Sequence, residues 1–517
     1  MIASAPPSGF RGTWHTGERA RGQAARISGP FRSDPGVYAI PDGPEDLVRL
    51  VSFARSEGLP LIPRGAGTGM PGGNLGRGVV FSLREGFADQ APVDDSSRTV
   101  RVGAGVTGDQ VEALARSRNL TFPPLPSSAR WCTVGGMVAN NAAGARSFGH
   151  GAVHRWVESA EGVDASGERF VVGANTPGTG PLADTAALDR ALDLEDPRFP
   201  PWPRVRKNSS GYALDRYRSS GTPLDLLTGS EGTLGILTAV QLRLHPRAAE
   251  RGLLVLGVGD ASEASELAVG AASTGAVACE FLGHRFLELA GLAEDLALEP
   301  LVRDAWALFL LEFEGDLEQV RIGLDEGMAL ADACGGSRSR ALSTTDPRRI
   351  DDLWSLRRRA SPLIAREAER GRISTQFIED CVVPPHHLGD FLVGLDRILA
   401  STGFDAVIFG HAGDGNVHVN PLVDVHTPGW RDRVRRALLD TTELVAGLGG
   451  TMAGEHGDGR LRAPLLETIW GPEWCSAFRT VKDHFDPDGV LNPGVILPLP
   501  GQDPLEGLHP RKRSWPS

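Results

Sequence analysis

Two histidines flank a predicted tight turn in residues 411–418, and their spacing suits metal binding. Asp414 and Gly415 form a favoured pair for a two-residue hairpin turn between two apolar, strand-like segments. With that turn His411 pairs directly with His418, which brings their Cβ atoms to roughly 4.5–5.5 Å. Two imidazoles at this separation can bind one ion through bonds of about 2 Å. Strand alternation also places Asn420 on the face of His418.

A second motif, residues 454–460, places Glu455 next to His456. Because adjacent residues of an extended chain point apart, we expect the two to have different roles. Glu455 is predicted as a third metal ligand, and His456 as a base that accepts a proton. The alternative for each histidine is a hydrogen-bonded structural or surface residue. We favour a metal-binding and proton-transfer site over this alternative, because four polar groups converge on glycine-rich turns.

Three glycine-rich loops in the first half of the chain must position a further component. Residues 64–74 hold five glycines, and closely spaced glycines let backbone N–H groups converge on an anion. A Rossmann turn would need a helix directly afterwards, whereas strand-like residues 79–83 follow here. An ordinary glycine-rich turn is the alternative for this loop alone. Residues 124–144 and 229–236 form the second and third loops.

The three loops, in this order and at these intervals, resemble the FAD-binding domain of the vanillyl-alcohol oxidase/p-cresol methylhydroxylase superfamily. The resemblance implies that the first loop holds the FAD pyrophosphate, the second follows the flavin and the third meets the adenine side. The first loop has neither His nor Cys, which favours non-covalent FAD. The implied cofactor-binding residues are Pro63, Arg64, Gly65, Ala66, Gly67, Thr68, Gly69, Gly73, Asn74, Pro126, Ser127, Ser128, Thr133, Gly135, Gly136, Ala139, Asn140, Asn141, Gly144, Glu231, Gly235, Ile236 and Asn492.

The histidine motifs resemble the C-terminal domain of FAD-linked 2-hydroxy-acid dehydrogenases, including D-lactate dehydrogenases, glycolate oxidase flavin subunits and D-2-hydroxyglutarate dehydrogenase. The resemblance implies oxidation of a 2-hydroxy acid to a 2-oxo acid, with hydride passing to the flavin. It assigns a divalent metal, zinc or manganese, to His411, His418 and Glu455. It also assigns proton abstraction to His456 and substrate contact to Asn420.

Residues 356–361 resemble the family segment that holds the substrate carboxylate, which implies this role for Arg357 and Ser361. A solvated helix face is the alternative for this arginine run. Relatives specific for longer dicarboxylates have a lysine where this chain has Ile378, so we expect a monocarboxylate such as lactate or glycolate. Lys207 could replace the missing cation, although a surface position is the alternative. Val495 stands where the family usually has another lysine.

The periodicity predicts an α+β fold of several parts. We expect an N-terminal arm at residues 1–34, an FAD-binding domain at 35–246, a C-terminal substrate domain at 247–498 and a tail at 499–517. The substrate domain is predicted as a sheet covered on one face by helices, including one long helix at 348–370. Residues 177–203 are the most loop-like insertion.

Composition excludes several other functions. The net charge of −12 has no basic stripe, which argues against nucleic acid as a partner. The five scattered cysteines argue against a thiol-bound metal cluster and suit a reducing compartment. No apolar run approaches about 20 residues, so we expect a cytoplasmic protein, with peripheral membrane contact left open.

The implied partners are a small-molecule 2-hydroxy acid and an electron acceptor: quinone, an electron-transfer flavoprotein, an iron–sulfur subunit or oxygen. A homodimer is left open. Two rival functions share the FAD fold. One is a transferase resembling alkyl-dihydroxyacetone-phosphate synthase, and the other is a flavin subunit of a multi-subunit oxidase.

Overall fold

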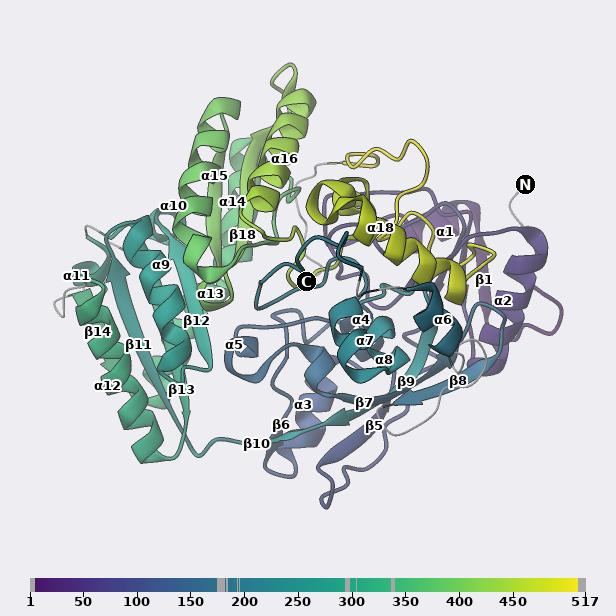
Figure 1. Ribbon diagram of the computed structural model, residues 1–517, viewed down its shortest axis with the longest axis horizontal. Helices are drawn as coiled ribbons and strands as arrows, with labels where there is room; N and C mark the ends of the chain where they lie inside the picture. The colour runs from purple at the N-terminus through teal and green to yellow at the C-terminus, as the bar shows by residue number, and fades with distance from the viewer. Residues whose placement is uncertain are drawn as a thin grey trace.

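The computed structural model describes residues 5–173, 182, 185–192, 194, 196–292, 298–303, 305–335 and 340–509. In Figure 1 the first half of the chain and the yellow C-terminal segment form one side, and the sheet containing β11–β13 lies on the other. The histidine motifs come from the second half, and the glycine loops come from the first.

A four-stranded sheet near the N-terminus carries the first glycine loop. Its strand order is β1 (Thr13–Thr16), β2 (Val37–Ile40), β4 (Val79–Ser82) and β3 (Leu61–Arg64), with α1 (Gly17–Ala24) and α2 (Pro44–Glu57) beside it. Strands β2, β4 and β3 are parallel. The described part of the predicted arm therefore contributes β1 and α1 to this sheet.

A second sheet and a short ribbon carry the other two glycine loops. The sheet order is β5 (Thr99–Gly103), β9 (Ile236–Arg243), β7 (Val157–Val163) and β8 (Arg169–Gly173); the ribbon pairs β10 (His245–Pro246) with β6 (Leu120–Thr121). The helices are α3 (Gly108–Arg116), α4 (Val134–Ala139), α5 (Ser147–His150), η1 (Val153–Arg155), α6 (Thr185–Ala191), α7 (Leu214–Ser220) and α8 (Pro223–Leu227). The insertion predicted as loop-like at 177–203 thus contains helix α6, and its residues 177–181, 183–184, 193 and 195 lie outside the described part.

The third sheet has eight strands and carries the histidines. Its order is β14 (Ala341–Thr344), β11 (Glu250–Val258), β13 (Ala307–Gly315), β12 (Ala278–Gly283), β17 (Asp405–His411), β18 (Asn416–Asp424) and β15 (Arg372–Ser374), with β16 (Cys381–Val382) also paired to β18. Its helices are α9 (Ala261–Gly270), η3 (Ala271–Ser273), α10 (His284–Leu289), α11 (Glu299–Val302), α12 (Leu317–Ala333), α13 (Pro347–Arg358), α14 (Ala360–Glu367), η6 (Ala368–Arg370), η7 (Pro385–His387) and α15 (Leu388–Thr402).

The closing part of the chain returns toward the first half. It contains η8 (Ala412–Asp414), α16 (Trp430–Gly447), α17 (Gly459–Arg462), η9 (Ala463–Leu465) and α18 (Leu466–Phe485). Helix α18 packs Trp470 and Phe478 into the same core as the second sheet. In Figure 1 this yellow helix lies over α4, α6 and α7.

Helices cover both faces of the third sheet, so the prediction of one covered face was wrong. Leu254 and Leu256 of β11 belong to a core that includes residues of α9, α12 and α15. Leu253 and Val255, which point to the opposite face, belong to a core with residues of α10, α11 and α13. A strand buried on both faces has a continuous apolar run, as β11 has.

The predicted single helix at residues 348–370 is divided into α13 and α14. The break follows Arg358, and Pro362 lies in the first turn of the second helix. Proline lacks the backbone N–H that would continue the hydrogen-bond ladder of α13, so the helix restarts there.

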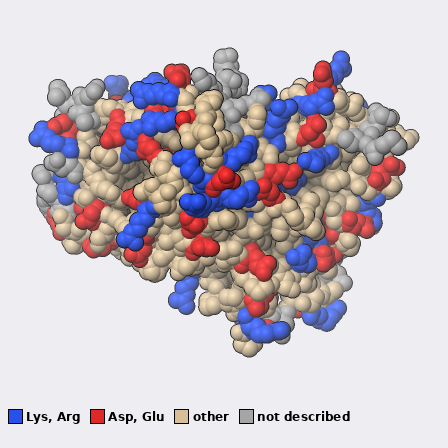
Figure 2. Space-filling view, turned by 90° about the horizontal axis from the view of Figure 1, so that it is seen from above, with Lys and Arg blue, Asp and Glu red and all other residues tan. Residues whose placement is uncertain are grey.

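The structure also shows the apolar character of the helices and the charge on one face of the molecule. Among the described residues, no helix combines enough length and apolar character to cross a membrane. On the face shown in Figure 2, basic and acidic side chains are intermixed and do not form a stripe of one sign.

Candidate active site

The hairpin that carries both histidines differs in register from the prediction. His411 pairs with Asn416, and His418 pairs with Phe409. The connection has four residues, 412–415, in which η8 is followed by Gly415 with φ 69°. The predicted two-residue turn was therefore wrong. A register change of two residues keeps every side chain on its face, so the histidines still meet, with ring centroids 5.2 Å apart.

In all three imidazoles the Nδ1 atom is occupied by an oxygen atom of the protein. The Nδ1 atom of His411 bonds the Glu280 carboxylate, and Nδ1 of His418 lies 3.0 Å from the backbone oxygen of Glu379. Nδ1 of His456 lies 2.9 Å from a carboxylate oxygen of Glu379. With each Nδ1 occupied, the Nε2 atoms are the ones available for a ligand.

Glu455 lies where the three Nε2 atoms converge. Its Oε1 atom is 3.5 Å from Nε2 of His411, 3.3 Å from Nε2 of His418 and 3.6 Å from Nε2 of His456. Residues 454–456 form a bend, so the expectation that Glu455 and His456 point apart was wrong. The two neighbours face one site, where His456 is the more exposed, at 27% of its side chain.

Two overlapping groups of side chains could hold a cation. His411, His418 and Glu455 form one group, and Glu379, His418 and His456 form the other; within each, the donor atoms lie within 4.8 Å of one another. The first group fits better, because Glu379 already accepts from the Arg462 guanidinium at 2.8 Å and from His456. Two imidazoles and one carboxylate are a common donor set for zinc and manganese.

Buried charge around this group favours a cation. Among the described residues, four buried carboxylates contact the imidazoles, Glu280, Glu379, Asp380 and Glu455, and a fifth, Asp414, contacts Lys207 beside Glu455. The permanent cations that contact them are Lys207, Arg357, Arg462 and the partly exposed Arg206. The acids therefore outnumber the permanent cations, and a buried excess charge needs neutralisation by protonated imidazole or a bound cation.

The site carboxylates raise the pKa values of His456 and His411. Burial alone would lower the pKa of His456, but the charges of Glu379 and Asp380 overcome it and raise this pKa to about 10. Burial would also lower the pKa of His411, and Glu280 raises it. Negative potential of this kind also favours a metal cation, which competes with the proton for the same nitrogen atoms.

The predicted substrate-binding residues lie in different surroundings. The Arg357 guanidinium donates to Glu280 at 2.9 Å and lies 4.3 Å from the centroid of the Phe409 ring. Glu280 also bonds His411, so this one carboxylate connects Arg357 to the imidazole. Ser361 is exposed in the first turn of α14. Asn420 is buried and accepts from Gln376 at 3.3 Å.

The first glycine loop has the features of an anion cradle. In the described part of the chain, the backbone N–H groups of residues 65–69 have no intramolecular acceptor. Successive free amides of partly buried glycines fit a phosphate group. The Arg64 guanidinium is occupied with the carbonyl oxygen of Arg26 at 2.8 Å.

The three glycine loops pack directly on each other. A Cβ at Gly65 would lie 2.3 Å from Thr133 Oγ1 in the second loop. A Cβ at Gly232 would lie 2.4 Å from Pro63 at the start of the first. These approaches explain why the motif needs glycine. Ile236, predicted to contact the cofactor, is fully buried in a hydrophobic core.

Each glycine loop also contacts the second histidine motif. Asn140 donates to the backbone oxygen of His456 at 2.7 Å, and the Glu231 carboxylate accepts from the N–H of Asp458 at 2.7 Å. In the first loop, the backbone oxygen of Pro71 accepts from the N–H of Arg460 at 2.9 Å, and Asn492 connects this loop to the third by donating to the backbone oxygens of Gly73 and Glu231, both at 2.8 Å. A flavin held by these loops would therefore lie next to His456.

Four supporting residues escaped the sequence analysis as parts of the site. Glu280, Glu379 and Arg462 position the imidazoles through charge, and they lie outside any recognisable spacing pattern. Lys207 was considered only as a substitute for a missing cation or as a surface residue, whereas it is 4% exposed and contacts Glu455. A lone lysine in an arginine-rich chain was the available signal.

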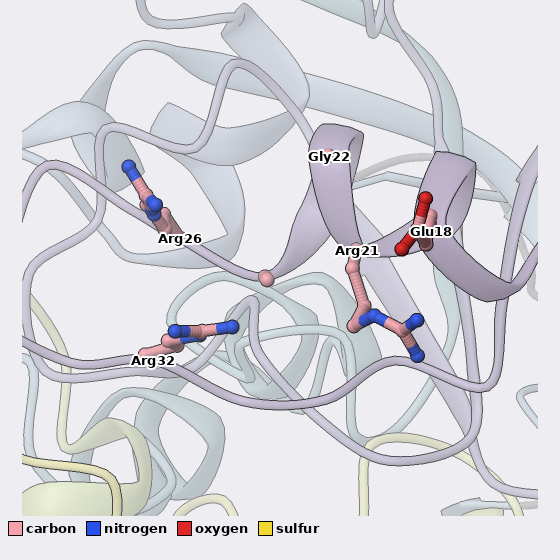
Figure 3. Close-up of a pocket in the computed structure, with 6 residues that line it drawn as sticks. Glu18, Arg21, Gly22, Arg26 and Arg32 are labelled. Atoms are coloured by element: carbon pink, nitrogen blue, oxygen red, sulfur yellow. The ribbon is translucent and has the colours of Figure 1, made fainter.

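A cavity of about 370 Å³ lies at the N-terminal segment, away from the histidines. Figure 3 shows Glu18 and Arg21 on α1, with Arg26 and Arg32 on the chain that follows. Its neighbour is the first glycine loop, since Ser28 donates to the Gly67 oxygen at 3.0 Å. The lining holds no histidine, so this cavity lacks the groups for proton abstraction.

Comparisons with known proteins agree with this geometry. Residues 35–173 match a family model described as FAD binding domain, and residues 247–496 match one described as FAD linked oxidases, C-terminal domain. D-lactate dehydrogenase of Archaeoglobus fulgidus is 30% identical over 90% of this chain and 93% of its own length. Glycolate oxidase subunit GlcD of Bacillus subtilis is 29% identical over 90% of each chain.

D-2-hydroxyglutarate dehydrogenase of Escherichia coli is 28% identical over 94% of this chain, which covers 51% of that protein. Among solved structures, 4-ethylphenol oxidase from Gulosibacter chungangensis superposes with a TM-score of 0.68 at 14% identity, over 96% of this chain and 99% of that one. Alkyldihydroxyacetonephosphate synthase superposes with a TM-score of 0.64 at 15% identity, over 95% of this chain and 87% of that one.

Those two structural likenesses show the fold alone, which is the mixed α and β fold of the p-cresol methylhydroxylase type. The sequence relatives and the family models go further. The chain belongs to the FAD-linked oxidases of the vanillyl-alcohol oxidase/p-cresol methylhydroxylase superfamily and is an FAD-dependent oxidoreductase.

Proposed function

We propose that this enzyme oxidises a 2-hydroxy acid to the 2-oxo acid at a site that binds a divalent metal. The observation that carries the proposal is the convergence of three imidazole Nε2 atoms on Glu455 Oε1, at 3.3–3.6 Å. The names of the sequence relatives support the substrate class. Residues 35–246 would bind FAD, and residues 247–498 would bind substrate.

When bound, FAD would supply a hydride acceptor, and a zinc or manganese ion, which His411, His418 and Glu455 would hold, would lower the pKa of the substrate hydroxyl. His456 Nε2 accepts the hydroxyl proton, because this imidazole is the most exposed of the three and lies beside Glu455. Glu379 holds the opposite ring nitrogen and so fixes the orientation of the base. Arg357 and Ser361 are proposed to bind the substrate carboxylate, and Asn420 to contact substrate.

The position of Ile378 supports a small monocarboxylate, lactate or glycolate. Its side chain is fully buried in the core that also contains Phe377 and Val419. It therefore offers no cation to a second carboxylate. Equal turnover of D-2-hydroxyglutarate and D-lactate would contradict this preference.

We further propose that FAD is non-covalent and that the reduced flavin passes electrons to a quinone, an electron-transfer flavoprotein, an iron–sulfur subunit or oxygen. The test of the whole function is anaerobic mixing of the holoenzyme with D- and L-2-hydroxy acids. Loss of the oxidised flavin absorption with one enantiomer is expected. No bleaching with any 2-hydroxy acid would contradict the dehydrogenase and favour a transferase without net redox turnover.

A further inference from the structure

Lys207 comes from the first half of the chain but ends inside the histidine site of the second half. It lies in the segment between α6 and α7, 248 positions before Glu455 in the sequence. Its residue is 4% exposed. A buried ammonium group needs nearby carboxylates to compensate its charge, and for Lys207 these are Glu455 and Asp414.

Lys207 and the three imidazoles contact different oxygen atoms of Glu455. Lys207 Nζ lies 2.9 Å from Oε2 of Glu455, while Oε1 faces the three imidazoles. The same ammonium group lies 3.6 Å from Asp414 and 3.5 Å from the Asn416 side-chain oxygen. Burial would lower the pKa of Lys207, but Glu455 and Asp414 raise it.

We propose that Lys207 is a positioning residue that restricts Glu455 to one donor oxygen and thereby selects the metal. This rests on the proposed metal site. With Oε2 bound to the ammonium group, only Oε1 is available beside the two imidazoles. The protein then supplies three donors, and open positions remain for substrate.

The consequence is discrimination against calcium. Calcium takes six to eight oxygen ligands and often binds both oxygens of a carboxylate, whereas zinc, cobalt and manganese accept imidazole nitrogen and fewer ligands. A single carboxylate oxygen, two imidazoles and a nearby positive charge disfavour calcium on each count. Freeing Oε2 and removing the charge would reduce this discrimination.

The test uses the FAD-containing full chain, exchanged from its metal to cobalt. Lys207→Met removes the charge while keeping similar volume, and Lys207→Arg keeps the charge. Arg435→Met is the matched control, because this variant also loses a 2.9 Å ion pair, here with Asp503 on the surface. Cobalt ligand-field absorption is recorded at wavelengths beyond the oxidised flavin bands, since its intensity falls as coordination number rises. Calcium competition is measured by the cobalt released.

The wild-type protein, Lys207→Arg and Arg435→Met should share one cobalt spectrum and resist calcium. Lys207→Met should show weaker ligand-field bands and a calcium affinity raised at least about tenfold. An unchanged spectrum and unchanged calcium competition in Lys207→Met, with FAD retained, would overturn the role of Lys207 and leave the metal site standing.

Failure of the wild-type protein to bind cobalt or zinc would instead overturn the metal site itself, so the two failures are distinguishable. If Lys207→Met loses FAD or its melting transition, Lys207→Gln replaces it. That variant keeps a hydrogen-bond donor but no charge, and the same two outcomes for spectrum and calcium competition decide the role of Lys207.

Discussion

The carboxylate of Glu379 should set the pH at which the enzyme becomes active. Its oxygens lie 2.9 and 3.0 Å from Nδ1 of His456, and one also accepts from Arg462 at 2.8 Å. Together with Asp380 it overcomes the effect of burial and raises the His456 pKa. Glu379→Gln keeps an acceptor oxygen at this position but removes the charge.

The magnitude follows from the loss of a charge-assisted hydrogen bond. Such a bond contributes about 1.5–3 kcal/mol, against about 0.5–1.5 kcal/mol for a neutral one. The difference of about 1–1.5 kcal/mol corresponds to about one pKa unit. A lower pKa leaves more unprotonated His456 at acidic pH, so the acidic limb of the kcat/KM profile should move down by about one pH unit. Looser positioning of the base should lower the plateau about tenfold.

The assay is anaerobic dye reduction with D-lactate across the pH range, at saturating FAD and metal. Glu312→Gln is the control, because Glu312 is equally buried and paired with Arg146 and Arg251, away from the histidines. An acidic limb that stays in place in Glu379→Gln, or that moves equally in Glu312→Gln, would refute the assignment of His456 as the base under control of Glu379.

Three further outcomes are expected. His411→Ala should retain FAD but hold less than about one tenth of the wild-type metal by elemental analysis, since one of three ligands is lost; equal metal content would contradict the ligand set. His456→Ala should keep metal and FAD but lose at least ~10²-fold in kcat, and near-normal turnover would reassign the base. Burial and Asp458 raise the pKa of Glu231 from 4.5 to about 8, so the folded state holds this proton more tightly. Wild-type stability should therefore fall as pH rises from about 4.5 to 8, and at pH ~9 the free energy of unfolding of Glu231→Gln should exceed that of the wild type by about 5 kcal/mol; parallel melting curves for both proteins would show that Glu231 does not titrate there.

The sequence was informative wherever spacing along the chain fixes geometry. The strand-like residues 79–83, expected directly after the first glycine loop, correspond to β4. Parity along a strand placed His411 and His418 on one face even though the turn type was wrong, because both registers have the same parity. The family resemblance predicted the fold and the presence of an FAD-binding domain.

The sequence was uninformative about contacts between distant segments. Glu280 is 131 positions from His411, and Lys207 is 248 positions from Glu455, so no periodicity connects either pair. The bend at residues 454–456 depends on Asp380, whose carboxylate accepts from three successive backbone N–H groups of Gly454, Glu455 and His456. An isolated segment of alternating residues carries no sign of such an acceptor.

The contacts of Asn140, Glu231 and Asn492 have a consequence for exchanging parts between relatives. The backbone of His456 and Asp458 is held by the Asn140 amide and the Glu231 carboxylate of the glycine loops, and the Asn492 amide of the C-terminal segment connects Glu231 to the first loop. A chimera that joins the first half of one family member to the second half of another would no longer match these donors to their acceptors. Such hybrids should fold and still misalign base and flavin, which would make substrate range harder to transplant than the domain boundary suggests.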